Sequence, residues 1–216
     1  MQRRDCIAAL LAASASPLVL AQVPPQEGLQ YRRLPQPLPT NTPGKIEVIE
    51  FFWYGCPHCF VFDPALKQWL AAVPADVAFR RVHVGFSGLF RLHQRLFYTL
   101  EAMGVEAELH DRVFTAFHIE RVPVETETAM QNLAAKLGLD ATKFRQAWTS
   151  FGVQSKGLQA TRLSDDYGIE GVPALAIAGR YVTAPDMAGA RGMSEQQLGV
   201  AALRVTDHLI GLARQQ

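Results

Sequence analysis

The stretch "KIEVIEFFWYGCPHC", residues 45–59, constrains the fold of this chain more than any other part of the sequence. It begins with a nearly continuous apolar run rich in β-branched and aromatic residues, which predicts a buried central strand. Gly55 ends the strand, and Pro57 suits the first turn of a helix, where its missing N–H costs no hydrogen bond. The pattern therefore places Cys56 and Cys59 where a buried strand passes into a helix.

The N-terminus has the features of an export signal. Arg3 and Arg4 form a basic segment, residues 6–20 are mostly apolar, and small residues near Ala21 fit a cleavage site. The apolar run is about 15 residues long, whereas a helix that spans a membrane needs roughly 20. We therefore predict a cleaved signal peptide over residues 1–21, with a retained membrane anchor as the alternative.

The charge of the mature chain excludes one broad class of function. The 21 basic and 20 acidic residues become 19 of each once Arg3, Arg4 and Asp5 are removed. A net charge near zero gives no electrostatic footprint of a nucleic-acid-binding protein. A mature chain of roughly 195 residues is long enough to bury one good core, so a single compact domain is expected.

Cleavage also removes Cys6 and leaves Cys56 and Cys59 as the cysteines of the mature chain. A bridge between them would close a very small loop, which gives the least chain-entropy stabilisation. A structural zinc site would need two further ligands, and no second CxxC or HxxxH motif supplies them. A reactive dithiol is therefore favoured over a structural disulfide or half of a metal site.

The rest of the sequence predicts an alternation of strands and helices. A proline-rich leader with one short strand is expected first, then the central strand, the CPHC helix and a strand over "VAFRRVHV", residues 77–84. Helical spacing predicts successive helices over residues 89–104, 106–120, 126–138, 139–151 and 153–167, with Asp140 as an N-cap. "GVPALAIAGRYVT" predicts a hairpin that turns at Gly179–Arg180, and "SEQQ" is a capping box for a final helix to about Arg214.

This order resembles the DsbA family of thiol–disulfide oxidoreductases. The resemblance rests on "EFFWYGCPHC", the "VHV" strand end, the helical block and "GVPA", and it spans essentially the whole mature chain. It implies an α/β, thioredoxin-like fold with an inserted helical domain. We predict a signal peptide over 1–21, an extended leader over 22–44, a thioredoxin-like core over 45–86 and 156–216, and a helical insertion over 87–155.

The position of each thiol predicts its role. Cys56 opens a helix, so its sulfur should face unpaired N–H groups and be the exposed sulfur that a substrate attacks. A helix dipole supplies about 0.3–1 kcal/mol and at most about 2, so local N–H donors, Cys59 and His58 must stabilise the thiolate further. Cys59 should be the buried resolving thiol. His58 should tune the pair through a partial positive charge, while the other histidines are expected to be solvated.

Further site residues depend on the resemblance. It implies a cis peptide bond at Pro173, in a loop over the disulfide that leaves the main chain of Val172 free to pair with an extended substrate. Glu50 matches a buried acid of the family, so it is expected to be buried and to relay the proton of Cys59, with a carboxylate on a sheet edge as the alternative. Tyr54 and Pro57 are assigned to the substrate-binding surface. Asp63 and Arg81 match charged family positions, with a solvated ion pair as the simpler interpretation.

The resemblance also implies the setting in which the protein works. We expect a monomeric periplasmic dithiol oxidase that donates its disulfide to newly exported polypeptides and is reoxidised by a DsbB-type, quinone-linked membrane protein. No cofactor and no metal are expected. A strongly oxidising disulfide and an acidic first cysteine are carried over from this family. The alternatives are a disulfide isomerase or reductase, a glutathione-dependent isomerase, and a metal-binding module that uses Cys56, His58 and Cys59.

Overall fold

The computed structural model describes residues 23–216 of the chain. The predicted signal peptide and Cys6 lie outside the described residues. In the part of the chain that is described, no helix combines the length and apolar character needed to cross a bilayer.

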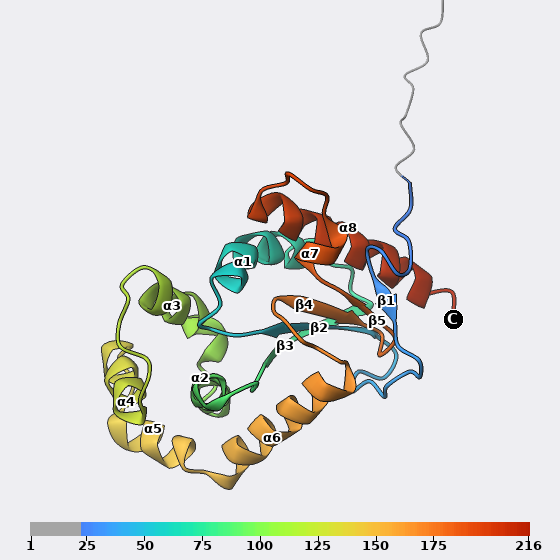
Figure 1. Ribbon diagram of the computed structural model, residues 1–216. Helices are drawn as coiled ribbons and strands as arrows, with labels where there is room; N and C mark the ends of the chain where they lie inside the picture. Colours follow the sequence, from blue (N-terminus) through green and yellow to red (C-terminus); the bar gives the residue numbers. More distant parts are fainter. Residues whose placement is uncertain (1–22) are drawn as a thin grey trace, which may run out of the picture.

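One sheet of five strands, in the order β1-β5-β4-β2-β3, forms the centre of the molecule (Figure 1). β2 (Ile46–Phe52) runs parallel to β3 (Val77–His83) and antiparallel to β4 (Ala174–Ile177). β5 (Tyr181–Thr183) pairs with both β4 and the short edge strand β1 (Arg32–Arg33). All residues of β2 except the first are buried, as its apolar run predicts.

Helices cover both faces of the sheet. α1 (Pro57–Leu70) and α8 (Glu195–Ala213) pack against each other on one face, beside the short α7 (Pro185–Ala188) (Figure 1). α2 (Gly88–Ala102) and α6 (Phe151–Asp166) lie on the opposite face and contact each other. The side chains of β2 therefore alternate between two hydrophobic cores, one on each face of the sheet.

The helical block consists of α2 together with α3 (Glu106–His118), α4 (Glu127–Lys136) and α5 (Ala141–Trp148). α3 contacts α1, so the block reaches the helix that carries the two cysteines. α6 runs without interruption through residue 155 and joins the block to the sheet. The predicted division of the chain into core and insertion stays a prediction.

Two local predictions are corrected by the structure. The hairpin turns at Ala178–Gly179, one residue earlier than expected. These two residues have φ of 55° and 66°, and Arg180 N donates a hydrogen bond to Ile177 O at 3.0 Å. Glycine is required at position 179 because a Cβ there would come within 2.1 Å of Leu38 O. The short helix α7 was not predicted, because four residues are too few to show helical periodicity.

Candidate active site

Cys56 occupies the N-cap of α1, as the position of Pro57 in the sequence predicts. Its backbone N donates to Trp53 O at 2.9 Å in the turn after β2, and its Sγ accepts a bond from Cys59 N at 3.4 Å. We expected an exposed sulfur, but the residue is only 6% exposed. The correction has a direct cause, since Val172 of the loop before β4 covers the thiol, with its carbonyl oxygen 3.3 Å from Cys56 Sγ.

The surroundings of Cys56 stabilise its thiolate. A bond from the Cys59 thiol lowers the pKa most, burial opposes this, and the backbone N–H groups of Cys59 and His58 and the charge of His58 lower it further. The resulting pKa of Cys56 is about 6. A thiol with this pKa is about 90% ionised at pH 7, against a few per cent for an ordinary cysteine.

Cys59 lies one turn deeper and is fully buried. Burial raises the pKa of its thiol well above the usual range, and Cys56 and the charge of Glu50 raise it further. The two thiols of the motif, which form no disulfide in the structure, are therefore shifted in opposite directions. Cys56 is the nucleophilic member of the pair, and Cys59 holds its proton.

His58 lies at the surface. Its side chain is 63% exposed, and its Nδ1 is 3.2 Å from Glu195 Oε1 at the start of α8. Among the influences on the pKa of Cys56, the charge of His58 comes after the Cys59 thiol and two backbone N–H groups. The imidazole therefore has a smaller effect on the thiolate than its place between the cysteines suggested.

The loop before β4 faces the dithiol. The Val172–Pro173 peptide bond is cis, as the resemblance implied, and Val172 O contacts Cys56 Sγ. Pro57 is exposed beside Cys56, in keeping with its assignment to the substrate-binding surface. Tyr54 is not available for that role, because it is fully buried and its hydroxyl lies 3.2 Å from His110 Nδ1. Its aromatic ring packs in the core instead of meeting a substrate.

A groove of about 510 Å³ lies next to the cis-proline loop. Apolar side chains from four parts of the chain line it, among them Phe62, Ile169, Val172, Pro173, Val182, Ala184, Met187 and Leu198. His58 and Glu195 are also among its lining residues, so the groove extends to the CPHC turn. An apolar groove beside a reactive thiol suits an extended polypeptide that exposes apolar side chains.

Glu50 is buried near the dithiol and belongs to a network of charges. Arg81 Nε donates to Glu50 Oε2 at 2.9 Å, and Arg81 Nη2 donates to Asp63 Oδ1 at 3.1 Å. Burial raises the pKa of Glu50, although Arg81 and His110 act in the opposite direction. Glu50 and Asp63 are both almost inaccessible, so the solvated ion pair considered for Asp63 and Arg81 is wrong.

Three histidines in this region were not predicted to be part of the site. His83, His93 and His110 are all buried, which corrects the expectation of solvated imidazoles. His110 joins the charge network because its Nε2 lies 3.3 Å from Asp63 Oδ1, and Glu106, four residues earlier on α3, lies beside its Nδ1. The i,i+4 spacing of these two residues was a visible signal, but the sequence alone did not show that α3 packs against α1.

A thioredoxin-like fold with an activated cysteine at a helix start, a buried second cysteine and a cis-proline loop above them defines a thiol:disulfide oxidoreductase. The family model of the DSBA-like thioredoxin domain matches residues 47–196. The chain belongs to this family.

Named relatives and solved structures agree with this assignment. The thiol:disulfide interchange protein DsbA of Azotobacter vinelandii is 42% identical over 183 residues, which cover 85% of this chain and 82% of the relative. DsbA of Bordetella parapertussis is 39% identical over 206 residues, or 95% of each chain. The crystal structure of Pseudomonas aeruginosa DsbA superposes with a TM-score of 0.79 at 37% identity, over 87% of this chain and 94% of that one.

Proposed function

We propose that this oxidoreductase is a periplasmic dithiol oxidase that donates a Cys56–Cys59 disulfide to newly exported polypeptides. The observation that carries the proposal is the low pKa of Cys56, about 6, beside a Cys59 thiol that keeps its proton. Stabilising the thiolate stabilises the reduced protein, and a stable reduced form makes the disulfide a stronger oxidant. A reductase instead needs a disulfide form that is stable relative to its reduced form.

The reaction begins when a substrate thiolate attacks Cys56 Sγ of the disulfide. The bond between the two protein sulfurs breaks, a mixed disulfide forms, and Cys59 leaves as a thiolate that takes up a proton. A second substrate thiolate then attacks the substrate sulfur and releases Cys56 as a thiolate. The substrate loses two electrons and gains a disulfide, and the protein ends as Cys56 thiolate and Cys59 thiol.

Glu50 is the proposed partner of Cys59 in the proton step. Its buried carboxyl has a raised pKa, so a protonated form is populated closer to neutral pH than for an ordinary glutamate. The acid gives its proton to the Cys59 thiolate, and Arg81, 2.9 Å away, stabilises the carboxylate that remains. In the reverse direction, during reoxidation, the same carboxylate takes the proton from Cys59.

The proposed binding surface for the substrate is the cis-proline loop with the adjoining groove. Val172 and Pro173 contribute backbone and apolar surface, and Pro57 borders Cys56 on the other side. An extended segment can lie across Val172 as an added strand while its apolar side chains enter the groove. His58 has a modest share in tuning Cys56.

The proposed partners and location rest on the family and its named members. Members of this family act on other proteins and are reoxidised by a partner, and a DsbB-type membrane protein that transfers electrons to quinone is the reoxidant we propose here. We further propose a monomer in the periplasm, in accord with the export signal predicted for residues 1–21.

The redox equilibrium of the mature protein with glutathione tests the direction of transfer. We expect a potential more oxidising than about −180 mV, the value typical of protein disulfide isomerase. A potential near −270 mV, roughly that of thioredoxin, would show a reductase and overturn the oxidase proposal.

A further inference from the structure

His110 is a buried histidine that has no role in the reaction proposed above. It lies in the middle of α3, in the helical block, and its side chain is 4% exposed. Its Nδ1 is 2.9 Å from Glu106 Oε1 on the same helix and 3.2 Å from the Tyr54 hydroxyl. Its Nε2 is 3.3 Å from Asp63 Oδ1 on α1. The imidazole thus lies between two carboxylates from different helices.

A continuous chain of polar side chains leads from His110 to the residue beneath Cys59. The Asp63 oxygen that faces His110 also accepts a bond from Arg81 Nη2 at 3.1 Å. The same guanidinium binds Glu50 through Nε at 2.9 Å. The contact between His110 Nε2 and Asp63 is electrostatic, since its geometry does not make a hydrogen bond. Four elements, α3, α1, β3 and β2, therefore meet through side chains at this point.

The charges around His110 favour its protonated form. Asp63 and Glu106 supply two negative charges, Arg81 and His83 are the basic groups nearby, and Lys67 contacts Asp63 at 2.6 Å on its outer side. Burial lowers the pKa of His110, but its contacts with the carboxylates of Asp63 and Glu106 raise it, and the resulting pKa is above the ordinary value. His83, in contrast, is driven toward its neutral form by burial.

We propose that His110, as an imidazolium, is a positioning residue that fixes the Asp63–Arg81–Glu50 chain and thereby sets how readily Glu50 exchanges a proton with Cys59. The inference rests on the proposed role of Glu50. The positive charge of His110 offsets the negative charge of Asp63. The Arg81 guanidinium is therefore less neutralised by Asp63 and can stabilise the Glu50 carboxylate. His110 also acts directly on Glu50, because its charge favours the ionised carboxyl.

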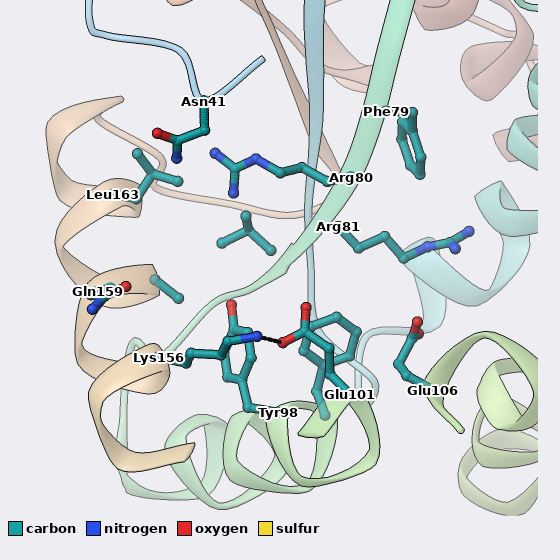
Figure 2. A pocket seen from close by; sticks show the side chains of 13 residues that line it. Asn41, Phe79, Arg80, Arg81, Tyr98, Glu101, Glu106, Lys156, Gln159 and Leu163 are labelled. Atoms are coloured by element: carbon teal, nitrogen blue, oxygen red, sulfur yellow. Dashed lines mark hydrogen bonds and ion pairs between the residues drawn. The ribbon is translucent and has the colours of Figure 1, made fainter. Parts of the chain in front are cut away.

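The network of His110, Asp63, Arg81 and Glu50 is open to solvent on one side. Arg81 and Glu106 line a pocket of about 490 Å³ at the edge strand β3, on the side away from the peptide groove, and Figure 2 shows both side chains among those around it. Lys156 and Glu101 form an ion pair across the same pocket. The network therefore equilibrates with solvent protons, so that a pH titration will report its equilibrium state.

The test is a titration of the Glu50 carboxyl by carbon NMR in the reduced mature protein. His110→Gln removes the charge and keeps an amide of similar reach. We expect the Glu50 titration to move up by roughly half to one pH unit, about a three- to tenfold change in proton affinity. His93→Gln is the matched control, because it also removes a buried imidazole but one whose neighbours are Trp53 and Val124 O instead of carboxylates. It should leave the Glu50 titration in place.

Wild-type protein provides a measurement that does not depend on a variant folding. The Glu50 signal should show a second inflection at the pH where the His110 ring titrates. A Glu50 curve without that inflection, or one that is the same in His110→Gln, would overturn the proposal. The role of Glu50 is tested separately with Glu50→Gln, by the pH dependence of closure of a Cys56 mixed disulfide. No change there would refute Glu50 as proton partner, whatever the NMR titration shows.

Discussion

Cys56 and Cys59 stand two residues apart, yet their environments shift their thiol pKa values in opposite directions. We expect Cys56 to react with iodoacetamide at acidic pH, with a midpoint near its pKa of about 6, because the thiolate is the nucleophile. Cys59 should stay unmodified across the same range. The rate of alkylation against pH, with mass spectrometry to locate the label, measures both. A midpoint near 8.5, the ordinary value, would contradict the activation of Cys56.

His58 should influence Cys56 less than its position suggests. In His58→Ser the backbone N–H stays at the helix start while the side-chain charge is lost, so the pKa of Cys56 should rise by less than about one unit. The disulfide should become a correspondingly weaker oxidant. Thiolate absorbance against pH, together with the glutathione equilibrium, gives both quantities. Unchanged values in both measurements would leave His58 as a solvated side chain with no role in tuning.

Single residues were predictable where local sequence determines their surroundings. The dithiol and Pro57 at the first turn follow from an apolar strand that runs into CPHC, whereas the burial of Glu50 was an implication of the family resemblance. Tyr54 was misplaced because an aromatic side chain beside a turn can face either the solvent or the core. It faces inward here because His110, which is distant in sequence, binds its hydroxyl.

At the scale of elements, helix ends offer a direct test of the local assignments. Asp140 caps α5, and its Oδ1 accepts bonds from Thr142 N at 3.0 Å and Lys143 N at 2.8 Å. Asp140→Ala should lower the free energy of unfolding by about 1 kcal/mol, the usual contribution of an N-cap. Urea unfolding of reduced protein provides the measurement.

Asp140→Asn is the control for this prediction. Asparagine can still accept a bond from the helix N-terminus, so this variant should keep most of the stability that alanine loses. If both substitutions destabilise the protein equally, the negative charge at the helix N-terminus is responsible, and the two hydrogen bonds are not.

Elements with strong periodicity were predicted well, and the reasons are physical. α8 begins at its predicted capping box, in which Ser194 Oγ accepts from Gln197 N and the Gln197 side chain accepts from Ser194 N. The strand order could not be derived from periodicity, because strand pairing depends on contacts between distant segments. α7 was not predicted because four residues carry no periodic signal. The packing of α3 against α1 was not predicted either, because it also depends on contacts between distant segments.

At the scale of the whole molecule, the activated thiolate links redox state to stability. Cys56 has a pKa of about 6 in the folded reduced protein and an ordinary, higher value once unfolded. Its folded pKa is depressed, so its contribution to the stability of the reduced form is complete above the unfolded pKa and disappears as pH falls through about 6. The oxidised form has no thiolate, so it lacks this contribution to its stability.

The stability of reduced protein relative to oxidised protein should therefore increase as the pH rises toward neutral. The thiolate contributes on the order of 1 kcal/mol at pH 7, whereas the chain-entropy contribution of the short disulfide loop, about 2 kcal/mol, does not vary with pH. Urea unfolding of both forms between pH 5 and 8 measures the difference. It should grow with rising pH and shrink below about 6, where Cys56 becomes protonated. A stability difference that does not vary with pH would show that the Cys56 thiolate is not its source, because the contribution of a thiol with a pKa of about 6 must change across this range.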